Sequence, residues 1–388
     1  MEKVKQLFYI THIDNVDSIL RHGIMSHKMI EESKIPFTRI YDAQIVSSRQ
    51  NRKTPDDKSL WEYANVYLQA RNPMLYRVLC EKNAAEIAVI GIDRSIMTTP
   101  GTFFSAGNAA SSLSEIVPIK DSGKVYKEIK NCLESQWWKD EDGSKRKIMA
   151  ECLIPSHISP EYLRTIYVSN DTNAEKIKKI AVGYKVHIIP EPQLFFESSV
   201  KIQVTPYLSV VKGDMFFSRF HTLTVSVNVV GIMGKGLASR AKYQFPDVYV
   251  HYQDVCRNKK LRMGNPVLYK RETSLDYQLV DAPQSLSNGN GETWFLLFAT
   301  KTHWRENSDF NGIEEGMKWL NENYKKEGIK SLALPALGCG LGNLKWQDVV
   351  PMLCKYLKNF EIPVQLYLPA ERDIAPEYLT KEFLLSKV

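Results

Sequence analysis

The sequence has none of the features that mark a membrane-spanning, secreted or metal-binding chain. No apolar run approaches the ~20 residues of a membrane-spanning helix, and the first residues, MEKVKQLFYI, do not have the layout of a signal peptide. The six cysteines include no CxxC pair, which argues against a zinc site and against a disulfide framework. We therefore expect a cytoplasmic protein with reduced cysteines, no membrane contact and no metal.

A dense basic surface is also missing, although the net charge is +7. Residues 1–200 carry 27 Lys and Arg against 25 Asp and Glu, and the remaining residues carry 24 against 19. Neither half has the charge density of a protein that holds DNA through counterion release alone. The charge therefore permits a nucleic-acid substrate but does not by itself indicate one.

The chain does have the length for two domains. Its 388 residues suffice for two separate cores, and 44% hydrophobic and 24% charged residues are ordinary for globular proteins. Residues 190–207 contain three prolines and a polar patch, so we place a boundary near residue 200 and expect domains at 1–200 and 201–388. No Gly/Ser-rich linker appears there, so we expect the two domains to be closely joined and in contact.

In the second half, two glycine-rich turns each follow an apolar run with strand character. The turns contain Gly231, Gly234 and Gly236 in the first, and Gly338, Cys339, Gly340, Leu341 and Gly342 in the second. Glycines let the backbone approach a ligand, and free N–H groups at the start of the following helix bind anions. The first turn matches neither GxGxxG nor the P-loop pattern, so alone it favours a plain strand-to-helix connection. Two such turns at the carboxyl ends of strands, however, could enclose a diphosphate.

Four motifs connect this half to a known family. They are KGD at 212–214, VNVVGIMGKGLA at 227–238, FATKTHWR at 298–305 and LPALGCGLGNLKW at 334–346. Together they resemble a macrodomain of the DarG type, over roughly residues 205–370. The resemblance implies an antitoxin that binds ADP-ribose and strips it from DNA, on an α/β fold with a mixed sheet between helices. The alternation of strand-like and helical runs favours the same α/β class.

The resemblance also implies roles for individual residues of this half. Asp214 would bind the adenine amino group, Asn228 the ribose, and the two glycine turns the diphosphate. Lys301 would be catalytic, because a lysine whose pKa is lowered by desolvation can attack the ribose C1 or open the ring, releasing the unmodified base. The pattern alone leaves simpler roles open: a helix cap for Asp214, a strand-end turn for Asn228 and a surface position for Lys301. Ser226 stands where the family usually has an asparagine.

The first half opens with a strand-like run at 7–12, which a helical run follows. Asn15 or Asp17 can cap this helix, and Gly23 stands where a helix ends in the left-handed conformation. His12 lies at the junction of strand and helix. From the pattern alone, a histidine hydrogen-bonded to the backbone is its simpler interpretation.

Two later segments carry charged residues of interest. Residues 43–58 are polar without a pattern and predict a basic, solvated loop that carries Arg49. The run Lys147–Pro155 alternates as a strand does, with apolar residues on one face and Glu151 on the other. A carboxylate between apolar neighbours is costly to bury without a partner. Glu151 therefore lies either at the rim of the sheet, paired with a lysine, or in a polar site.

The remaining patterns predict ordinary elements. In the first half they are a strand at 61–68, a turn at Asn72-Pro73 before a helix, a central strand at 85–92, a small-residue loop at 103–112, a helix at 121–138 and a charged loop at 139–146. In the second half they are strands at 208–212, 223–230, around 266–280, 293–299, 329–334 and 364–368, helices at 237–245, 311–325 and 346–357, and a loop at 281–292.

Several segments of the first half follow the order of a second known family. They are YITHIDNVDSILRHGI, the loop with Arg49, VYLQARNPMLY, SAGNAAS, RKIMAECLIPSHI and GYKVHIIPEPQLFF, and they cover nearly all of residues 5–197. Together they resemble DarT, a toxin family of the ADP-ribosyltransferase superfamily that uses NAD to modify bases in single-stranded DNA. The resemblance implies an α+β fold of the ADP-ribosyltransferase type.

The same resemblance implies the site residues of this half. The contacts to NAD would come from His12, Asn15 and Gly23. Arg49 would stand beside the reacting centre, and Glu151 would be the catalytic glutamate. Asn108 stands where some members carry a histidine, and its role stays open. The segment NVYLQARNPML is less aromatic than in the family, so the modified base stays open, with thymidine expected first and guanosine as an alternative.

The chemistry of such a transfer calls for these residue types. Breaking the bond between nicotinamide and ribose develops positive charge on the sugar. The carboxylate of Glu151 can hold the ribose hydroxyls and stabilise that charge, or take a proton from the attacking base nitrogen. The planar fork of Arg49 suits a phosphate or a nucleobase. A single strand presents its base without a flipping cost, and Tyr67 and Tyr76 are candidates to stack it, although such tyrosines are more often core residues.

The two resemblances together predict a fused toxin–antitoxin chain. Its first domain would transfer ADP-ribose from NAD to a DNA base, and its second domain would remove it. Two alternatives stay open. The second domain could bind ADP-ribose without removing it, or block the first domain physically, and the first domain could modify RNA or protein.

Overall fold

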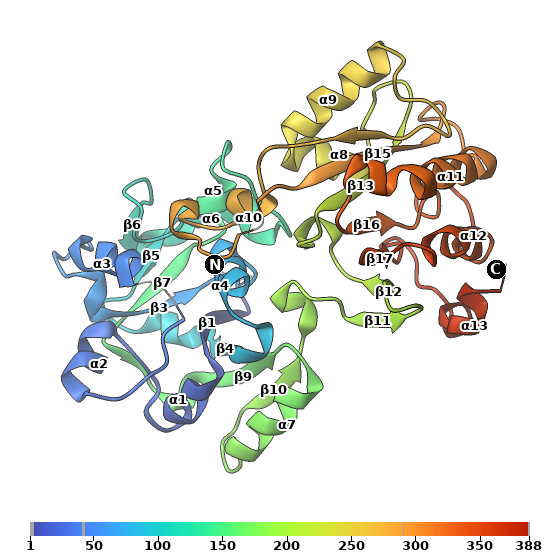
Figure 1. Ribbon diagram of the computed structural model, residues 1–388. Helices are drawn as coiled ribbons and strands as arrows, with labels where there is room; N and C mark the ends of the chain where they lie inside the picture. Colours follow the sequence, from blue (N-terminus) through green and yellow to red (C-terminus); the bar gives the residue numbers. More distant parts are fainter. Residues whose placement is uncertain (1–3, 41–42, 290, 387–388) are drawn as a thin grey trace. The chain divides into compact units, whose positions relative to one another are not determined.

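The chain folds into two compact units (Figure 1), and the computed structural model describes residues 4–40, 43–289 and 291–386. The first unit comprises Met1–Glu197 together with Asp276–Gly289, and the second comprises Ser198–Leu275 with Asn290–Val388. The sequence does not predict that the chain returns to the first unit at Asp276–Gly289. Most of the loop expected at 281–292 packs into the first unit, although the second half of the sequence supplies it.

The first unit is built on a mixed sheet with the strand order β10-β9-β4-β1-β3-β7-β5-β6. Its neighbouring strands are antiparallel, apart from the parallel pair β10 and β9. The strands are β1 (Gln6–His12), β3 (Tyr63–Tyr67), β4 (Ile87–Asp93), β5 (Phe103–Ser105), β6 (Ile116–Pro118), β7 (Glu151–Pro155), β9 (Leu163–Val168) and β10 (His187–Pro190), with a separate pair β2 (Ile24–Met25) and β8 (His157–Ile158).

Helices cover both faces of this sheet. They are α1 (Val16–His22), α2 (His27–Ser33), α3 (Ala43–Asn51), α4 (Pro73–Glu81), α5 (Ser122–Glu134), α6 (Ser144–Lys147) and α7 (Asp171–Ile180). Leu20 of α1, Ile129 of α5 and Ile177 of α7 join the core cluster on one face. Leu75 and Val78 of α4 join the cluster on the other. Burial of apolar side chains on both faces explains why β4 reads as a continuous apolar run, the central strand that the sequence predicts.

One face of the sheet positions the candidate site of the first unit. Phe8 of β1 stands opposite Tyr67 of β3, and Tyr67 stands opposite Glu151 of β7. Directly opposed residues in antiparallel strands point to the same face, as do residues two apart along one strand. His12 therefore shares this face with Glu151, about 13 Å farther along β1 at the usual strand rise.

The second unit contains a mixed sheet with the strand order β11-β12-β17-β16-β13-β15-β14. Strands β12, β17, β16, β13 and β15 run parallel, and β11 and β14 pair antiparallel at the two edges. The strands are β11 (Val200–Gln203), β12 (Leu208–Lys212), β13 (Thr222–Asn228), β14 (Val267–Tyr269), β15 (Trp294–Lys301), β16 (Leu332–Pro335) and β17 (Val364–Tyr367).

The helices of this half are α8 (Gly236–Gln244), α9 (Pro246–Arg257), α10 (Leu275–Leu279), α11 (Phe310–Glu327), α12 (Trp346–Leu357) and α13 (Lys381–Leu384). Side chains of α11 and α12 form one core cluster with Phe298 of β15. The neighbouring Phe295 points to the other face, where its ring lies 5.1 Å from that of Phe245, at the junction of α8 and α9. The sheet therefore lies between helical layers, which confirms the predicted α/β class, and the α+β class of the first unit is confirmed as well.

The parallel strands bring their carboxyl ends to one edge of the second sheet. Lys212, Asn228, Lys301, Pro335 and Tyr367 are the last residues of these strands. Open α/β sheets bind ligands at this edge because the loops that leave the strands converge there. Both glycine-rich turns of the sequence belong to this set of loops.

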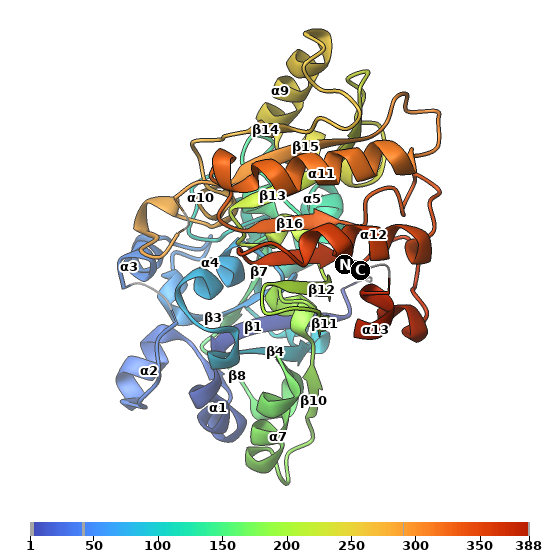
Figure 2. The same cartoon turned by 45° about the vertical axis from the view of Figure 1, so that its right-hand side comes forward.

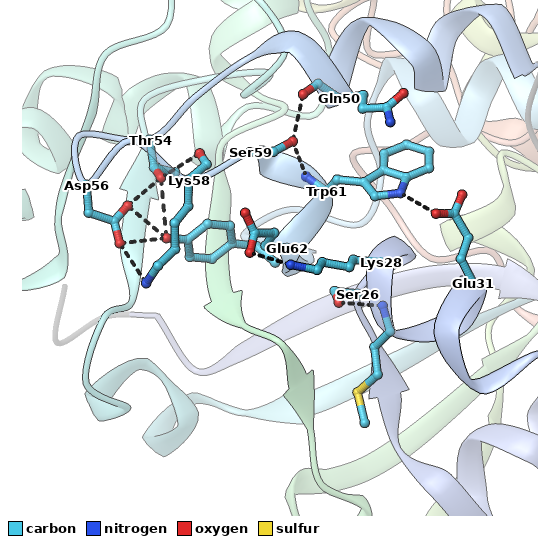
Figure 3. A network of polar contacts seen from close by, with 12 residues as sticks. Ser26, Lys28, Glu31, Gln50, Thr54, Asp56, Lys58, Ser59, Trp61 and Glu62 are labelled. Carbon is cyan, nitrogen blue, oxygen red and sulfur yellow. Dashed lines mark hydrogen bonds and ion pairs between the residues drawn. The ribbon is translucent and has the colours of Figure 1, made fainter.

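Two sequence-based expectations for secondary structure are wrong in the first unit. The polar segment expected as a loop at 43–58 begins with the helix α3, which no apolar periodicity signals. Its last turn is held from outside, since the Ser59 hydroxyl donates to the Gln50 carbonyl at 2.7 Å (Figure 3). The strand expected from Lys147 begins at Glu151, because the helix α6 occupies the residues before it.

Other boundaries shift as well. The helix expected at 121–138 ends at Glu134. The strands expected around 266–280 reduce to β14, which α10 follows. The helix α9 was not predicted; it begins at Pro246, a residue that suits the first turn of a helix because its missing N–H needs no partner there.

Candidate functional site

A buried ion pair forms the centre of the first unit's site. The Glu151 side chain is only 1% exposed, and Arg49 Nη2 lies 2.5 Å from its Oε2. Arg49 Nη1 donates to the other oxygen, Oε1, at 3.4 Å. The backbone N–H of Ala109 also donates to Oε1, at 2.9 Å. Of the two interpretations of Glu151, the polar site is the one observed, with an arginine and not a lysine as its partner.

Neighbouring side chains complete this cluster. With its amide oxygen turned toward the guanidinium, Asn65 accepts from Arg49 Nη2 and, at 3.1 Å, from Nε. Burial acts to lower the pKa of Arg49, but the Glu151 carboxylate outweighs it and holds the pKa above its ordinary value. Burial and the same carboxylate raise the pKa of the Tyr67 phenol. The arginine therefore stays protonated and the tyrosine neutral, in a site with little water.

Arg49 owes its position to a polar network that holds the segment after α3 (Figure 3). Thr54 donates to Asp56 at 2.6 Å, and the Tyr63 hydroxyl, from the start of β3, donates to the same carboxylate at 3.0 Å. Together with the bond from Ser59 to Gln50, these contacts tie the last turn of α3 to the sheet. Arg49 is thus held in place by the segment that directly follows it in sequence.

The small-residue loop after β5 supplies the backbone donor. The Asn108 carboxamide accepts from the Ala110 N–H at 3.0 Å, and the Asn108 N–H donates to the Arg146 carbonyl at 3.1 Å. These bonds shape the turn that points the Ala109 N–H at Glu151. Asn108 is therefore a turn-forming residue in this structure.

His12 and Asn15 lie at the far end of the same sheet face. His12 is buried, and its Nδ1 accepts from the Asp14 N–H at 3.2 Å. Asn15 exchanges two hydrogen bonds of 2.8 Å with the backbone of Thr38 and donates to Thr11 at 3.1 Å. Asn15 thereby ties the segment around Thr38 to the end of β1, and its side chain does not cap α1.

Two further residues from the sequence analysis, Gly23 and Tyr76, are buried in the first unit. Gly23 has a φ of +80°, and a Cβ there would lie 2.1 Å from the Ile158 carbonyl oxygen, so no larger residue fits. Tyr76 is buried, with its ring 5.1 Å from that of Phe196. In the described part of the chain, neither His12 nor Gly23 contacts the Arg49–Glu151 pair.

Sequence reasoning missed Asn65 and the Ala109 N–H as partners of the ion pair. A signal for Asn65 existed, because it shares one face of its strand with Tyr63 and Tyr67, and a polar side chain on a largely buried face needs a hydrogen-bond partner. The backbone donor of Ala109 had no such signal, since every residue but proline carries an N–H.

In the second unit, Asp214 follows β12 at the ligand-binding edge. Its Oδ1 accepts from Arg240 Nη1 at 2.8 Å and from the backbone N–H of Phe216 at 3.2 Å. The second bond caps the short helical turn that begins after it. Asp214 is therefore both a cap and the partner of an arginine that lies over the Phe216 ring.

Asn228 organises the first glycine turn from within. Its amide donates to the Ile232 carbonyl at 2.6 Å, while its Oδ1 accepts from the Val230 N–H at 3.1 Å and from the Tyr252 hydroxyl at 2.9 Å. Gly231, with a φ of +85°, makes the reversal possible because L-residues avoid that region. The carboxamide thus shapes the turn.

The second glycine turn approaches the first. A Cβ on Gly236 would lie 3.1 Å from Leu341 Cδ1, and one on Gly340 would lie 3.0 Å from Glu371 Oε2. Arg372 donates to the Gly340 carbonyl at 3.2 Å. Leu341 itself is 53% exposed beside these groups. The two turns therefore face one another at the strand ends, as the diphosphate hypothesis requires.

The remaining residues of the second turn are packed. Gly338 has a φ of +77°, and a Cβ there would lie 2.7 Å from Leu344 Cδ1. Cys339 is buried, which raises its thiol pKa to about 12, so it is no nucleophile. The Gly342 carbonyl accepts from the Ser308 N–H at 2.9 Å. Gly234, by contrast, is open, with its nearest neighbour atom 3.9 Å from a Cβ.

Lys301 ends β15 beside both turns. In the sheet it pairs with Asn228, which begins the first turn. Its Nζ donates to the Glu306 carbonyl at 2.8 Å and to the Leu341 carbonyl of the second turn at 3.4 Å. Burial lowers its pKa, opposed only in part by Glu306. Among the described residues its hydrogen-bond acceptors are backbone carbonyls and no carboxylate, so burial is the effect that favours the neutral amine.

The two sites therefore offer different chemistry. The first provides a buried carboxylate and a guanidinium at one end of a face that extends to His12. The second provides backbone N–H groups of two facing turns and an amine beside them. Among the residues that the structure describes, no group of His, Cys, Asp and Glu could hold a metal ion. The described helices also include none long and apolar enough to span a bilayer.

Comparisons with known proteins match each half of the chain to a family. Residues 8–196 match the family model of the ssDNA thymidine ADP-ribosyltransferase DarT, and residues 295–353 match that of the Macro domain. A DNA ADP-ribosyl transferase–DNA ADP-ribosyl glycohydrolase fusion protein of Thermosipho africanus is 52% identical over 99% of both chains. A DNA ADP-ribosyl glycohydrolase of Thermus aquaticus is 33% identical over 43% of each chain.

A solved structure extends the likeness to the whole chain. Thermosipho africanus DarTG, determined in complex with ADP-ribose, has a TM-score of 0.93 and 51% identity, and the match covers 98% of this chain and 100% of that one. Both resemblances drawn from the sequence are thereby confirmed. The chain belongs to the family of fused DarT–DarG proteins, in which a DNA ADP-ribosyltransferase and a DNA ADP-ribosyl glycohydrolase share one polypeptide.

Proposed function

We propose that residues 1–200 transfer ADP-ribose from NAD to a base of single-stranded DNA, and that residues 201–388 remove it again. Thymidine is the proposed base, because the matching family model is that of a thymidine-specific enzyme. The observation that carries the proposal is the buried Arg49–Glu151 pair at the end of a sheet face that also holds His12. The beginning of this face, with His12, Asn15 and Gly23, would receive NAD.

In the transfer, the bond between the ribose C1 and the nicotinamide nitrogen breaks, and its electron pair leaves with neutral nicotinamide. Glu151 stabilises the positive charge that develops on the sugar. The attacking base nitrogen forms the new bond to C1 and transfers its proton to Glu151, which acts as the general base. Arg49 holds the carboxylate in place through two parallel contacts and orients the incoming base or phosphate with its planar fork.

In the removal, the second unit's strand ends would hold the ADP-ribose group. Asp214 and Asn228 would bind its adenine and ribose, and both glycine turns would receive the diphosphate on their backbone N–H groups. Lys301 would act on C1 as a neutral amine, either by direct attack or by opening the ribose ring. The bond between C1 and the base nitrogen breaks, its electron pair leaves with the base, and the base takes up the proton that the attacking amine loses. Water then releases ADP-ribose and restores the free lysine. The lowered pKa and the position of Lys301 beside Leu341 and Asn228 support this role.

Single substitutions in the full chain test this division of labour better than separated halves do. A cut near residue 200 would remove Asp276–Gly289 from the unit into which it packs. We therefore expect a Lys301→Ala chain to accumulate ADP-ribosylated oligonucleotide when it is incubated with NAD and single-stranded DNA. A Glu151→Ala chain should leave DNA unmodified yet clear DNA that was modified beforehand. Mass spectrometry of the oligonucleotide reads both results.

The alternatives differ in the same assays. If the second unit only binds ADP-ribose or blocks its neighbour, Lys301→Ala leaves the clearance of modified DNA unchanged. If the acceptor is guanosine, RNA or protein, the label from NAD appears there and oligothymidylate stays unmodified. In cells, Glu151→Ala should relieve the toxicity of a Lys301→Ala chain, because the transferase would otherwise act unopposed.

We also propose that the protein works in the cytoplasm. The six cysteines are all free thiols, as a reducing compartment maintains them. Burial raises the pKa of the Cys152 thiol to about 12, which keeps this thiol protonated and unreactive. Detection of the tagged chain after cell fractionation checks the assignment.

A further inference from the structure

The segment Asp276–Gly289 is not explained by the proposed reactions. In sequence it lies between β14 and β15, yet it belongs to the first unit. Figures 1 and 2 both show its helix α10, coloured orange, beside α4. A connection between two adjacent strands of a sheet is usually short and local. This connection instead packs against the other unit, so we expect a role of the segment 276–289 in the first unit.

Specific hydrogen bonds hold the segment there. The Tyr76 hydroxyl donates to Asp276 Oδ1 at 2.8 Å, and the Trp138 indole N–H donates to the Leu279 carbonyl at 2.8 Å. Arg77 Nη2 donates to the Ser285 hydroxyl at 3.0 Å and to its carbonyl at 3.3 Å. These donors sit on α4 and just after α5, so the segment is docked by side chains and does not merely lie against the surface.

The surface beneath the segment is aromatic and basic. The Tyr76 and Trp138 rings both lie edge-on to Phe196, with centroids 5.1 and 6.1 Å from it, and Arg71 lies 4.5 Å over the same ring. Arg77 belongs to the same surface, where its Nη2 also lies 3.6 Å from Glu81 Oε1. Proteins bind single-stranded nucleic acid through aromatic rings that stack on the bases, combined with positive charge for the phosphates. The modest net charge of the chain fits a binding surface of this local kind.

An acidic residue of the segment stands among these positive charges. Burial raises the pKa of Asp281, and the positive charges of Arg77, Lys145 and Arg49 oppose that rise. Arg49 is the partner of Glu151. The Oδ1 of Asp281 is buried and has no hydrogen-bond partner among the described residues. A buried carboxylate oxygen without a hydrogen bond lowers the stability of the fold.

We propose that the surface formed by Tyr76, Arg77 and Trp138 binds the acceptor DNA strand, and that segment 276–289 occupies this surface in the resting chain. The inference rests on the proposed transfer to single-stranded DNA and adds the place where the strand binds. DNA must displace the segment, so its apparent dissociation constant exceeds the intrinsic one by the reciprocal of the fraction of molecules in which the segment is released. The antitoxin half of the sequence thereby restrains the transferase before any ADP-ribose needs to be removed.

The test measures binding of a fluorescein-labelled, thymidine-containing single-stranded oligonucleotide to the full chain by anisotropy, without NAD. The double variant Asp276→Ala/Ser285→Ala removes the segment's side of two docking contacts. We expect it to bind the oligonucleotide about tenfold more tightly, given the usual net strength of two hydrogen bonds. Asp281→Asn keeps the size of the side chain and removes its charge, and is expected to tighten binding several-fold, most clearly at low salt. Hydrogen exchange at 276–289 confirms that the segment is released.

Gln284→Ala is the matched control, because Gln284 is exposed on the same segment and should change neither affinity nor exchange. Unchanged or weaker oligonucleotide binding in a variant whose segment exchanges freely overturns the inference, since the segment would then not compete with DNA. NAD affinity, measured in parallel, should stay constant in all variants. If no variant and no parent chain binds single-stranded DNA, the proposed transfer to DNA fails as well, which separates that failure from a failure of the segment alone.

Discussion

The two candidate sites differ in the groups that form them, which are side chains in the first unit and mainly backbone groups in the second. The first unit relies on side chains, with the Glu151 carboxylate buried against Arg49, which lies 102 residues away in sequence. The second relies on backbone, with two glycine turns that face each other at the ends of parallel strands and Lys301 beside them. A site made of side chains concentrates its function in a few replaceable groups. A site made of backbone spreads ligand contacts over many N–H groups and is vulnerable mainly where glycine is required.

The largest expected effect is that of Glu151→Gln on the transfer reaction. The amide keeps the size of the side chain but removes the charge that stabilises the developing cation and accepts the proton. We expect the transfer rate to fall by roughly 10³-fold or more. Mass spectrometry of the oligonucleotide product measures it, and removal of ADP-ribose from DNA modified beforehand should be unaffected. A fall of less than tenfold would contradict the role of Glu151.

The counterpart in the second unit is Lys301→Ala. Loss of the amine removes the group that attacks or opens the ribose, so removal of ADP-ribose from DNA should fall by about 10²- to 10³-fold. Affinity for free ADP-ribose, measured by calorimetry, should change little because the glycine turns remain. Lys318→Ala, at an exposed position of α11, is the matched control. Equal losses of binding and removal would point to a binding role instead.

A pair of glycine substitutions tests the reliance on backbone. Gly338→Ala forces an L-residue to a φ of +77° and brings its Cβ within 2.7 Å of Leu344 Cδ1. We expect it to cost about 1–3 kcal/mol of stability and to weaken ADP-ribose binding. Gly234→Ala meets no atom closer than 3.9 Å and should be tolerated. Thermal denaturation and calorimetry of both variants decide the matter, and equal behaviour would show that the second turn is not constrained as described.

Asn65→Ala should have a smaller effect in the first unit. Asn65 touches Arg49 and not Glu151, so it positions the guanidinium. We expect the transfer rate to fall by about tenfold or less, which corresponds to one hydrogen bond to a charged group. Asn65→Asp should restore the contact to Arg49 and recover part of the rate. A purely structural role would instead lower the denaturation temperature in both variants without this recovery.

The pH dependence of the removal reaction gives the subtlest test. Burial lowers the pKa of Lys301 from its ordinary value of 10.5. The reactive neutral amine should therefore appear at lower pH than for an exposed lysine, and the removal rate should rise with pH and level off below 10.5. Because burial penalises the charged form, the cost in stability is present below the folded-state pKa and disappears as pH rises toward the ordinary value. A rate independent of pH from 6 to 10 would argue against a neutral lysine.

The sequence was a good guide wherever structure follows from local pattern. The strand at 208–212 and the helix at 346–357 have the predicted bounds, because each is a continuous run ended by a glycine or proline signal or by loss of periodicity. It was a poor guide at α3, whose polar residues carry no apolar stripe and which contacts made by the segment 52–63 hold in place. The sequence also did not predict the role of Asn108, because the turn that it forms acts through the Ala109 N–H, whose partner Glu151 is distant in sequence.

What the sequence by itself determined are the two glycine turns at strand ends, Gly23 at a helix end and the order of elements that places Lys301 last in its strand. These depend on backbone conformation and periodicity within a few residues. Only the tertiary structure decided that Arg49 meets Glu151 and that 276–289 packs with the first unit. The physical reason is that burying a charge or an apolar segment stabilises the fold only against partners that the chain brings from far away, and no local pattern records which partner that is.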